Sequence, residues 1–152
     1  MNFDVLFLDL DGVLNNNEFF AKQRANPKEY IHKKFCSGNI EVLEKLCSDF
    51  KVKEIVITST WRMGRSVQDL RDMLAKDGFK LANLITDKTD EIGGPGGRAE
   101  EIKSWMDIHK PNSHIVLDDN PIGDTTGLNF HRVHSSYGLT NDDLQKISEI
   151  SI

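Results

Sequence analysis

The run VLFL at residues 5–8 is wholly apolar, and two aspartates and a glycine follow it within four residues. A strand without polar alternation must be covered on both faces, which is typical of the parallel sheets of α/β proteins. Two further runs share this character, EIVIT at 54–58 and HIVLDD at 114–119, and each ends in hydroxyl or carboxylate side chains. The sequence therefore predicts a buried parallel sheet whose strands end in polar groups.

Helical segments with one apolar stripe separate these runs along the chain. Ser66 and Asp69 have the spacing of a capping box, and Gly78 provides a helix stop. Strands separated by single helices imply right-handed crossovers and a doubly wound, mostly parallel sheet with helices on both faces. The expected strands are 5–10, 54–58, 81–86, 114–117 and 128–133. The expected helices are 37–50, 66–78, 98–109 and one capped by Thr140, with a turn at the GGPGG segment, 93–97.

The chain has 152 residues, and we expect one domain over 1–152 with a short insertion at about 15–37. Hydrophobic residues at 38% and charged residues at 28% are typical of a soluble globular protein. No apolar stretch is long enough for a membrane helix, and the N-terminus lacks the basic region of a signal peptide. Two cysteines, Cys36 and Cys47, are too few for a disulfide framework. We therefore expect a cytoplasmic protein with reduced cysteines. We expect it to bind no membrane and to have no obligate protein partner.

Polar side chains gather where the predicted strands end. Ligands of such sheets bind at the carboxyl ends of the strands. Asp9 and Asp11 are two residues apart, so in an extended strand both would point to one face. Close carboxylates repel unless a cation lies between them, and a site of oxygen ligands alone fits Mg²⁺ better than zinc. The expected metal ligands are Asp9, Asp11, Asp118 and Asp119.

Four segments resemble the signatures of the haloacid dehalogenase (HAD) superfamily, in the family order. VLFLDLDGVLN resembles the first signature, IVITST the second and IVLDDN the fourth, and Arg98 falls where the third places a basic residue. The combination of DGVLN, TSTWR, GR..EI..W and VLDDN is further similar to the HAD-type phosphatase domains of RNA-repair proteins. The resemblance implies an HAD-like Rossmannoid fold and a phosphatase.

The resemblance also implies a role for each residue of the site. Asp9 would be the nucleophile that forms an aspartyl-phosphate, and Asp11 would be the general acid and then the general base. Thr58, Ser59 and Arg98 would bind the phosphoryl group, and Thr58 and Arg98 would also be catalytic. Apart from the resemblance, Arg62 lies just past the second signature and could bind a substrate phosphate. Mg²⁺ would screen the repulsion between the nucleophile and the phosphate. Lys88 is an alternative to Arg98 as the third-signature base.

The 15–37 insertion leaves no room for a full cap domain, which the resemblance takes to mean an open site. We expect a phosphomonoester substrate, with a nucleotide or a nucleic-acid terminal phosphate first. The alternatives are a phosphoprotein phosphatase, a receiver-like module phosphorylated on aspartate, and a non-catalytic binding module. Asp11 speaks against a receiver, because receivers lack a second acid as proton donor.

The insertion is basic, although the whole chain carries a net charge of −5. Between residues 22 and 34, five lysines and arginines face only Glu29. The aromatic residues interleaved with them could stack on bases, or could fix the segment to the core. The sequence leaves open whether this surface binds substrate. The aromatic residues concerned are Phe19, Phe20, Tyr30 and Phe35.

Overall fold

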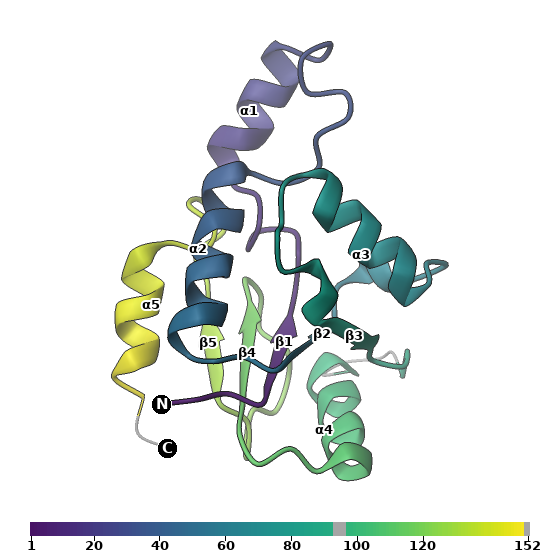
Figure 1. Ribbon diagram of the computed structural model, residues 1–152, viewed down its shortest axis with the longest axis vertical. Coiled ribbons are helices and arrows are strands. Elements are labelled where there is room, and N and C mark those ends of the chain that lie inside the picture. The colour runs from purple at the N-terminus through teal and green to yellow at the C-terminus, as the bar shows by residue number, and fades with distance from the viewer. Residues whose placement is uncertain (93–96, 151–152) are drawn as a thin grey trace.

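The computed structural model describes residues 1–92 and 97–150 and shows a five-stranded sheet with helices on both faces (Figure 1). The strand order is β3-β2-β1-β4-β5, and every pair of neighbours is parallel. The predicted doubly wound α/β sheet is therefore confirmed. The turn predicted at 93–97 lies mostly outside the described residues. The strands are β1 (Val5–Leu8), β2 (Glu54–Ile57), β3 (Ile85–Lys88), β4 (His114–Asp118) and β5 (Phe130–Arg132).

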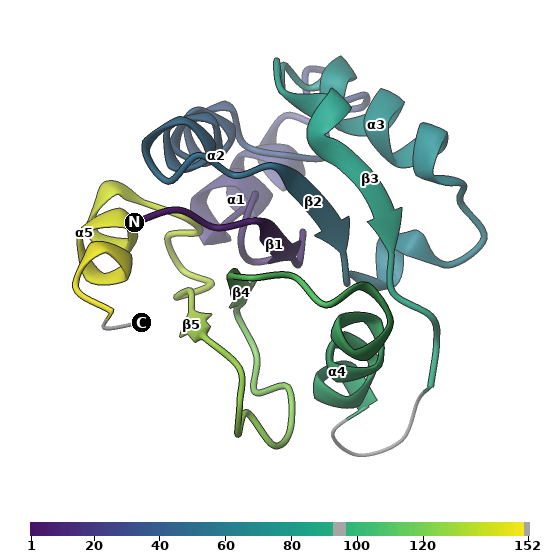
Figure 2. The same ribbon diagram turned by 60° about the horizontal axis from the view of Figure 1, so that its bottom comes forward.

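Two apolar cores lie on opposite faces of the sheet, because successive side chains of a strand point in opposite directions. On β1, Leu6 and Leu8 join the larger core, whereas Val5 and Phe7 join the smaller one. Figure 2 shows α2, α3 and α5 over one face and α4 over the other. The α-helices are α1 (Asn17–Ala25), α2 (Ser37–Asp49), α3 (Val67–Lys76), α4 (Gly97–His109) and α5 (Asn141–Ser148), with 3₁₀ turns η1 (Thr60–Arg62) and η2 (Ala82–Leu84).

The third strand begins later than predicted. The apolar residues of 81–84 form η2, and β3 then continues into polar residues as far as Lys88. Asp87 and Lys88 pair with Val56 and Ile57 at the edge of the sheet. Polar side chains are tolerated there because an edge strand has a neighbour on one side only. The apolar run therefore identified the strand but misplaced its ends.

The insertion after β1 contains a helix that the sequence patterns did not predict. Asn16 caps α1 by accepting a hydrogen bond from the Phe19 backbone N–H at 2.9 Å. The predicted capping box of α3 is present, with Ser66 and Asp69 bonded reciprocally. Figure 1 shows α1 standing beyond the edge at which the strands end. Among the described residues, the longest and most apolar helices still fall short of what a membrane crossing requires.

Candidate active site

Backbone hydrogen bonds continue the parallel ladder one residue beyond β1 and β2. The Asp9 N–H donates to the Leu117 carbonyl, and the Thr58 N–H donates to the Leu8 carbonyl, both at 3.0 Å. Asp118 is the last residue of β4, the other neighbour of β1. The fold therefore brings Asp9, Thr58 and Asp118 to one edge, at the carboxyl ends of adjacent strands.

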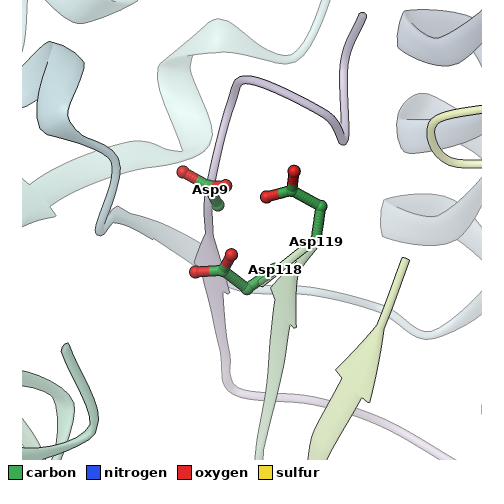
Figure 3. A group of neighbouring side chains, drawn as sticks. All are labelled: Asp9, Asp118 and Asp119. Atoms are coloured by element: carbon green, nitrogen blue, oxygen red, sulfur yellow. The ribbon is translucent and has the colours of Figure 1, made fainter. Parts of the chain in front are cut away.

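Three carboxylates meet at this edge. One oxygen from each of Asp9, Asp118 and Asp119 lies within 4.8 Å of the others, and Figure 3 shows the groups turned toward one another from the ends of β1 and β4. Both oxygens of Asp118 are engaged, one by the Asn120 N–H at 3.0 Å and one by Arg98. The buried Oδ1 of Asp119, in contrast, has no hydrogen-bond partner among the described residues. Asp119 therefore offers the cluster a free ligand atom.

Arg98 is the second residue of α4, the helix that covers the face of the sheet with the smaller core (Figure 2). From there its side chain reaches the carboxylate cluster. Its Nη1 lies 2.7 Å from Asp118 Oδ2 and 3.4 Å from Asp9 Oδ1. Lys88, the alternative third-signature base, donates instead to two backbone carbonyls in the 62–65 turn. Of the two candidates, Arg98 is thus the residue that contacts the carboxylates.

Burial and mutual repulsion disturb the protonation of the cluster. Desolvation, reinforced by the charge of Asp118, raises the pKa of Asp9 to about 9, and Arg98 offsets this only in part. Burial likewise raises the pKa of Asp119. Arg98 pairs with two of the three carboxylates, so a further positive charge would stabilise the ionised cluster. Mg²⁺ fits this donor set, because the ligand atoms are all oxygens and one of them is unpartnered.

Asp11 does not lie in the carboxylate cluster, which corrects the expectation that it shares a face with Asp9. β1 ends at Leu8, and the chain then turns, so the period of two no longer applies. Asp9 is 5% exposed, whereas Asp11 lies at the surface and accepts a hydrogen bond from Asn15 Nδ2 at 2.9 Å. The side chain of Asp11 therefore lies at the surface, outside the group formed by Asp9, Asp118 and Asp119.

Gly12 packs this turn against the cluster. Its φ is +81°, and a Cβ there would lie 2.1 Å from Asp119 Oδ2. Only glycine fits both constraints. Asn15 fixes the same turn, since its Oδ1 accepts from the Gly12 N–H at 2.7 Å. Asn15 closes the DGVLN motif, and no role for it was predicted from the sequence.

The hydroxyls of Thr58 and Ser59 differ in their surroundings. Thr58 is fully buried, and its Oγ1 has no hydrogen-bond partner within residues 1–92 and 97–150. Buried polar atoms are rarely left without a partner, and such exceptions mark positions where a ligand can supply one. Ser59 Oγ instead accepts from the Trp61 N–H at 3.2 Å and so caps η1.

Arg62 does not face the carboxylates, which corrects the prediction that it binds phosphate. Its side chain is 4% exposed, and Nη2 pairs with Glu101 of α4 at 3.0 Å. The other nitrogens donate to the backbone carbonyls of Thr58, Ser59 and Thr89. Because every arm of the guanidinium is engaged, Arg62 holds the turn after β2 in place. Glu101, a residue of the GR..EI..W motif without an assigned role, completes this arrangement.

The aromatic residues of the insertion pack mainly against one another. Phe19 is 5% exposed and meets Phe20 and Tyr30 edge to face, with ring centroids 5.8 and 5.6 Å apart. Phe35 is 1% exposed and packs in the same way on Trp61. Of the basic residues, Lys22 forms an ion pair with Glu18. Phe19, Phe20 and Tyr30 thus form a small cluster within the insertion, whereas Phe35 belongs to the larger core of the domain. The buried rings of Phe19 and Phe35 are not available to stack on bases.

A family model described as the HAD domain in Swiss Army Knife RNA repair proteins matches residues 5–144. No curated protein and no solved structure gives a significant match. The matched region begins at the first residue of β1, includes all five strands, and ends within α5. It contains every residue of the site just described.

Proposed function

This chain belongs to the family of HAD domains in Swiss Army Knife RNA repair proteins, and on that premise we propose that it is a Mg²⁺-dependent phosphatase acting on a terminal phosphate of RNA. The observation that carries the proposal is the buried carboxylate of Asp9, placed against Asp118 and Asp119 and within 3.4 Å of Arg98. The description of the family supports RNA as the substrate class. The proposal also treats residues 1–152 as a single HAD-like domain.

In the first step, a carboxylate oxygen of Asp9 attacks phosphorus. The bond from phosphorus to the ester oxygen breaks, and an aspartyl-phosphate forms on Asp9. The carboxyl group of Asp11 donates its proton to the departing oxygen, which leaves as an alcohol. The exposure of Asp11, together with its hydrogen bond from Asn15, suits a group that must reach both the substrate and water.

In the second step, a water oxygen attacks the phosphorus of the intermediate. Asp11, now a carboxylate, takes a proton from this water. The bond from phosphorus to the Asp9 oxygen breaks, which releases inorganic phosphate and restores the Asp9 carboxylate. The two steps together consume one water and return Asp11 to its protonated state.

Hydrogen bonding and charge hold the phosphoryl group during both steps. The Thr58 hydroxyl gains a phosphoryl oxygen as its partner, and the Ser59 hydroxyl can still donate its own proton. Arg98 stabilises the negative charge on the transferring group. Bound Mg²⁺, held by the carboxylates of Asp9, Asp118 and Asp119 and by the Asp11 carbonyl, would neutralise charge so that one anion can approach another. Positioning and electrostatics are the dominant contributions in phosphoryl transfer.

Hydrolysis of p-nitrophenyl phosphate tests the proposed function. We expect turnover with Mg²⁺, loss of turnover with EDTA, and recovery when Mg²⁺ is added in excess. Asp9→Asn should abolish turnover while the melting temperature shows that the chain still folds. Activity that survives chelation, or that survives Asp9→Asn, would contradict the proposal.

Asp11→Asn separates the two steps. p-Nitrophenolate needs no proton in order to leave, so the variant should release about one equivalent in a burst and then stall as the phosphorylated enzyme. A variant that turns over steadily at the wild-type rate would rule out Asp11 as the base of the second step.

Substrate class is tested with pentauridylates phosphorylated at the 5′ or the 3′ end, alongside phosphoserine and phosphotyrosine peptides. We expect the larger kcat/KM for one of the two RNA ends. A phosphopeptide with the larger kcat/KM would instead support the phosphoprotein phosphatase that the sequence left as an alternative.

A further inference from the structure

A hollow of about 410 Å³ opens directly beside the carboxylate cluster. Asp119 lies in its lining together with Arg132, Val133, His134 and Ser135. β5 pairs with β4 in parallel, and Arg132 is in register with Asp118. The carboxyl end of β5 therefore places this hollow at the same edge of the sheet as the proposed phosphate site.

The segment around the hollow has a charge unlike that of the rest of the chain. The protein has 24 acidic residues, yet none occurs between Asp124 and Asp142. Arg132 is exposed, and its Nε donates to the Asp119 carbonyl at 2.9 Å. Its terminal nitrogens bond no residue in the described part of the chain. The hydrogen bond from Nε thus fixes the Arg132 side chain, while its two terminal nitrogens remain available to an anion.

The segment is also firmly braced, and an aromatic side chain stands out from it. Asn39 of α2 donates to the carbonyls of Tyr137 and Leu139 at 3.1 and 2.9 Å. Gly138, with φ +66°, lies so close to the Asn39 amide that a Cβ would be 2.6 Å from Oδ1. Tyr137 is nevertheless 67% exposed, and its ring lies 5.3 Å from the ring of His134. An exposed aromatic pair on a fixed backbone is a pre-formed surface for stacking.

We propose that this hollow binds the nucleotide next to the terminal phosphate of an RNA strand, with Arg132 on the adjoining phosphate and His134 and Tyr137 on the base. This inference rests on the proposed function, because it takes the terminal phosphate to lie at Asp9. Asp119 joins the two parts, since its side chain belongs to the carboxylate cluster and it also lines the hollow. The RNA strand leaves the site over the end of β5. The basic insertion is not the main contact of the RNA.

The test compares a pentauridylate carrying a terminal phosphate with p-nitrophenyl phosphate, which has no second nucleotide. The measured quantity is the ratio of their kcat/KM values. Arg132→Gln should lower this ratio about tenfold, because a charged hydrogen bond to the adjoining phosphate is lost. Tyr137→Leu should lower it by a smaller factor, and Arg132→Lys should restore part of the loss.

Arg24→Gln provides a matched control, since it removes the same charge from an exposed position of the insertion. It should leave both kcat/KM values unchanged. Affinity for the pentauridylate, measured without divalent metal, adds a readout independent of turnover. The slope of log K against log salt should fall in magnitude by about 0.7 for Arg132→Gln and stay constant for Arg24→Gln.

An unchanged ratio and salt slope for Arg132→Gln would overturn the inference, and a loss confined to Arg24→Gln would assign the strand to the insertion. A phosphopeptide as sensitive to Arg132→Gln as the pentauridylate would exclude a nucleotide-specific hollow. If p-nitrophenyl phosphate is not hydrolysed at all, the proposed function fails. In that case the salt slopes still decide whether Arg132 contacts RNA.

Discussion

Two residues near the start of α4 form ion pairs in different surroundings. Arg98 extends to Asp118 and Asp9 at the carboxylate cluster, whereas Glu101, three residues later, pairs with the buried Arg62. Sequence patterns had assigned both arginines to the substrate phosphate. Arg98 is 21% exposed at its side chain, and Arg62 is 4% exposed. Burial therefore separates the two arginines: Arg62 is enclosed within the fold, whereas Arg98 stays accessible at the carboxylate cluster.

The two guanidinium groups also differ in how fully they are used. Arg62 donates to three backbone carbonyls besides Glu101, which leaves no nitrogen for a ligand. Arg98 makes its contacts through Nη1 alone among the described residues. The pair at Arg62 fixes the turn that carries Thr58, while Arg98 retains donors for a phosphoryl oxygen.

The largest expected effect is on catalysis at Arg98. Arg98→Ala should reduce kcat for p-nitrophenyl phosphate by about 10³-fold, because charge on the transferring phosphoryl group loses its main protein partner. Arg98→Lys should recover part of that loss. The melting temperature in Mg²⁺ should change little. A variant that unfolds while the folded fraction retains full activity would reverse the roles assigned to the two arginines.

The next largest effect is on stability at Arg62. Arg62→Ala should lower the free energy of unfolding by about 3–5 kcal/mol, since Glu101 would be left as an unpaired buried charge. Urea denaturation followed by circular dichroism measures this. The double variant Arg62→Met, Glu101→Leu should recover only the part of the loss that comes from the unpaired charge. Three backbone carbonyls still lose their donor in this variant. If Arg62→Ala were as stable as the wild type and failed only in substrate binding, the scaffold role would be wrong.

A smaller effect is expected at Thr58, the residue that Arg62 positions. Thr58→Val should lower kcat by roughly tenfold, because one hydrogen bond to the phosphoryl group is lost. The free energy of unfolding should stay within about 1 kcal/mol of the wild type, because the buried Oγ1 has no partner to lose. Thr89→Val is the matched control. Thr89 also carries a buried Oγ1 without a hydrogen-bond partner in the described part of the chain, yet it follows β3 and has no assigned role. Equal losses of kcat in both variants would refute a specific role for the Thr58 hydroxyl.

The smallest expected effect is on how the free energy of unfolding depends on pH. His114 at the start of β4 is buried, and its Nε2 accepts a hydrogen bond from the Asn129 N–H at 3.0 Å. Burial lowers the pKa of His114, so the unfolded chain binds a proton more readily than the folded one. Stability from this group is therefore complete above about pH 6.5, the ordinary histidine pKa, and is lost as the pH falls through the lower folded value.

Urea midpoints measured between pH 8 and pH 5 test this pH dependence. His114→Gln keeps a hydrogen-bond acceptor but does not titrate, so its midpoint should fall less steeply toward low pH than that of the wild type. Identical slopes for the two proteins would mean that another group controls the acid side.

Features that depend on residues close in sequence were predicted better than features that depend on where the chain runs in the fold. The capping box of Ser66 and Asp69 depends on residues three apart and was predicted correctly. Helix α1 was missed because its cap, Asn16, is followed by a weakly amphipathic stretch in which Phe19 is the buried residue. Asp11 does not share a face with Asp9 because the chain leaves the sheet after Leu8, and the period of two holds only within a strand.

The order of residues along the chain was sufficient to predict the α/β sheet and the acidic residues at the ends of its strands. Apolar runs and helical stripes are properties of neighbouring residues, and parallel pairing then brings the strand ends together. Contacts between distant segments decided the remaining features. They determined which arginine reaches the carboxylates, which hydroxyls are left without a partner among the described residues, and whether aromatic rings face water or one another. Packing of α4 against the sheet, and of the insertion against itself, decided these matters, because burial forces a charged or polar group to take whatever partner lies within reach.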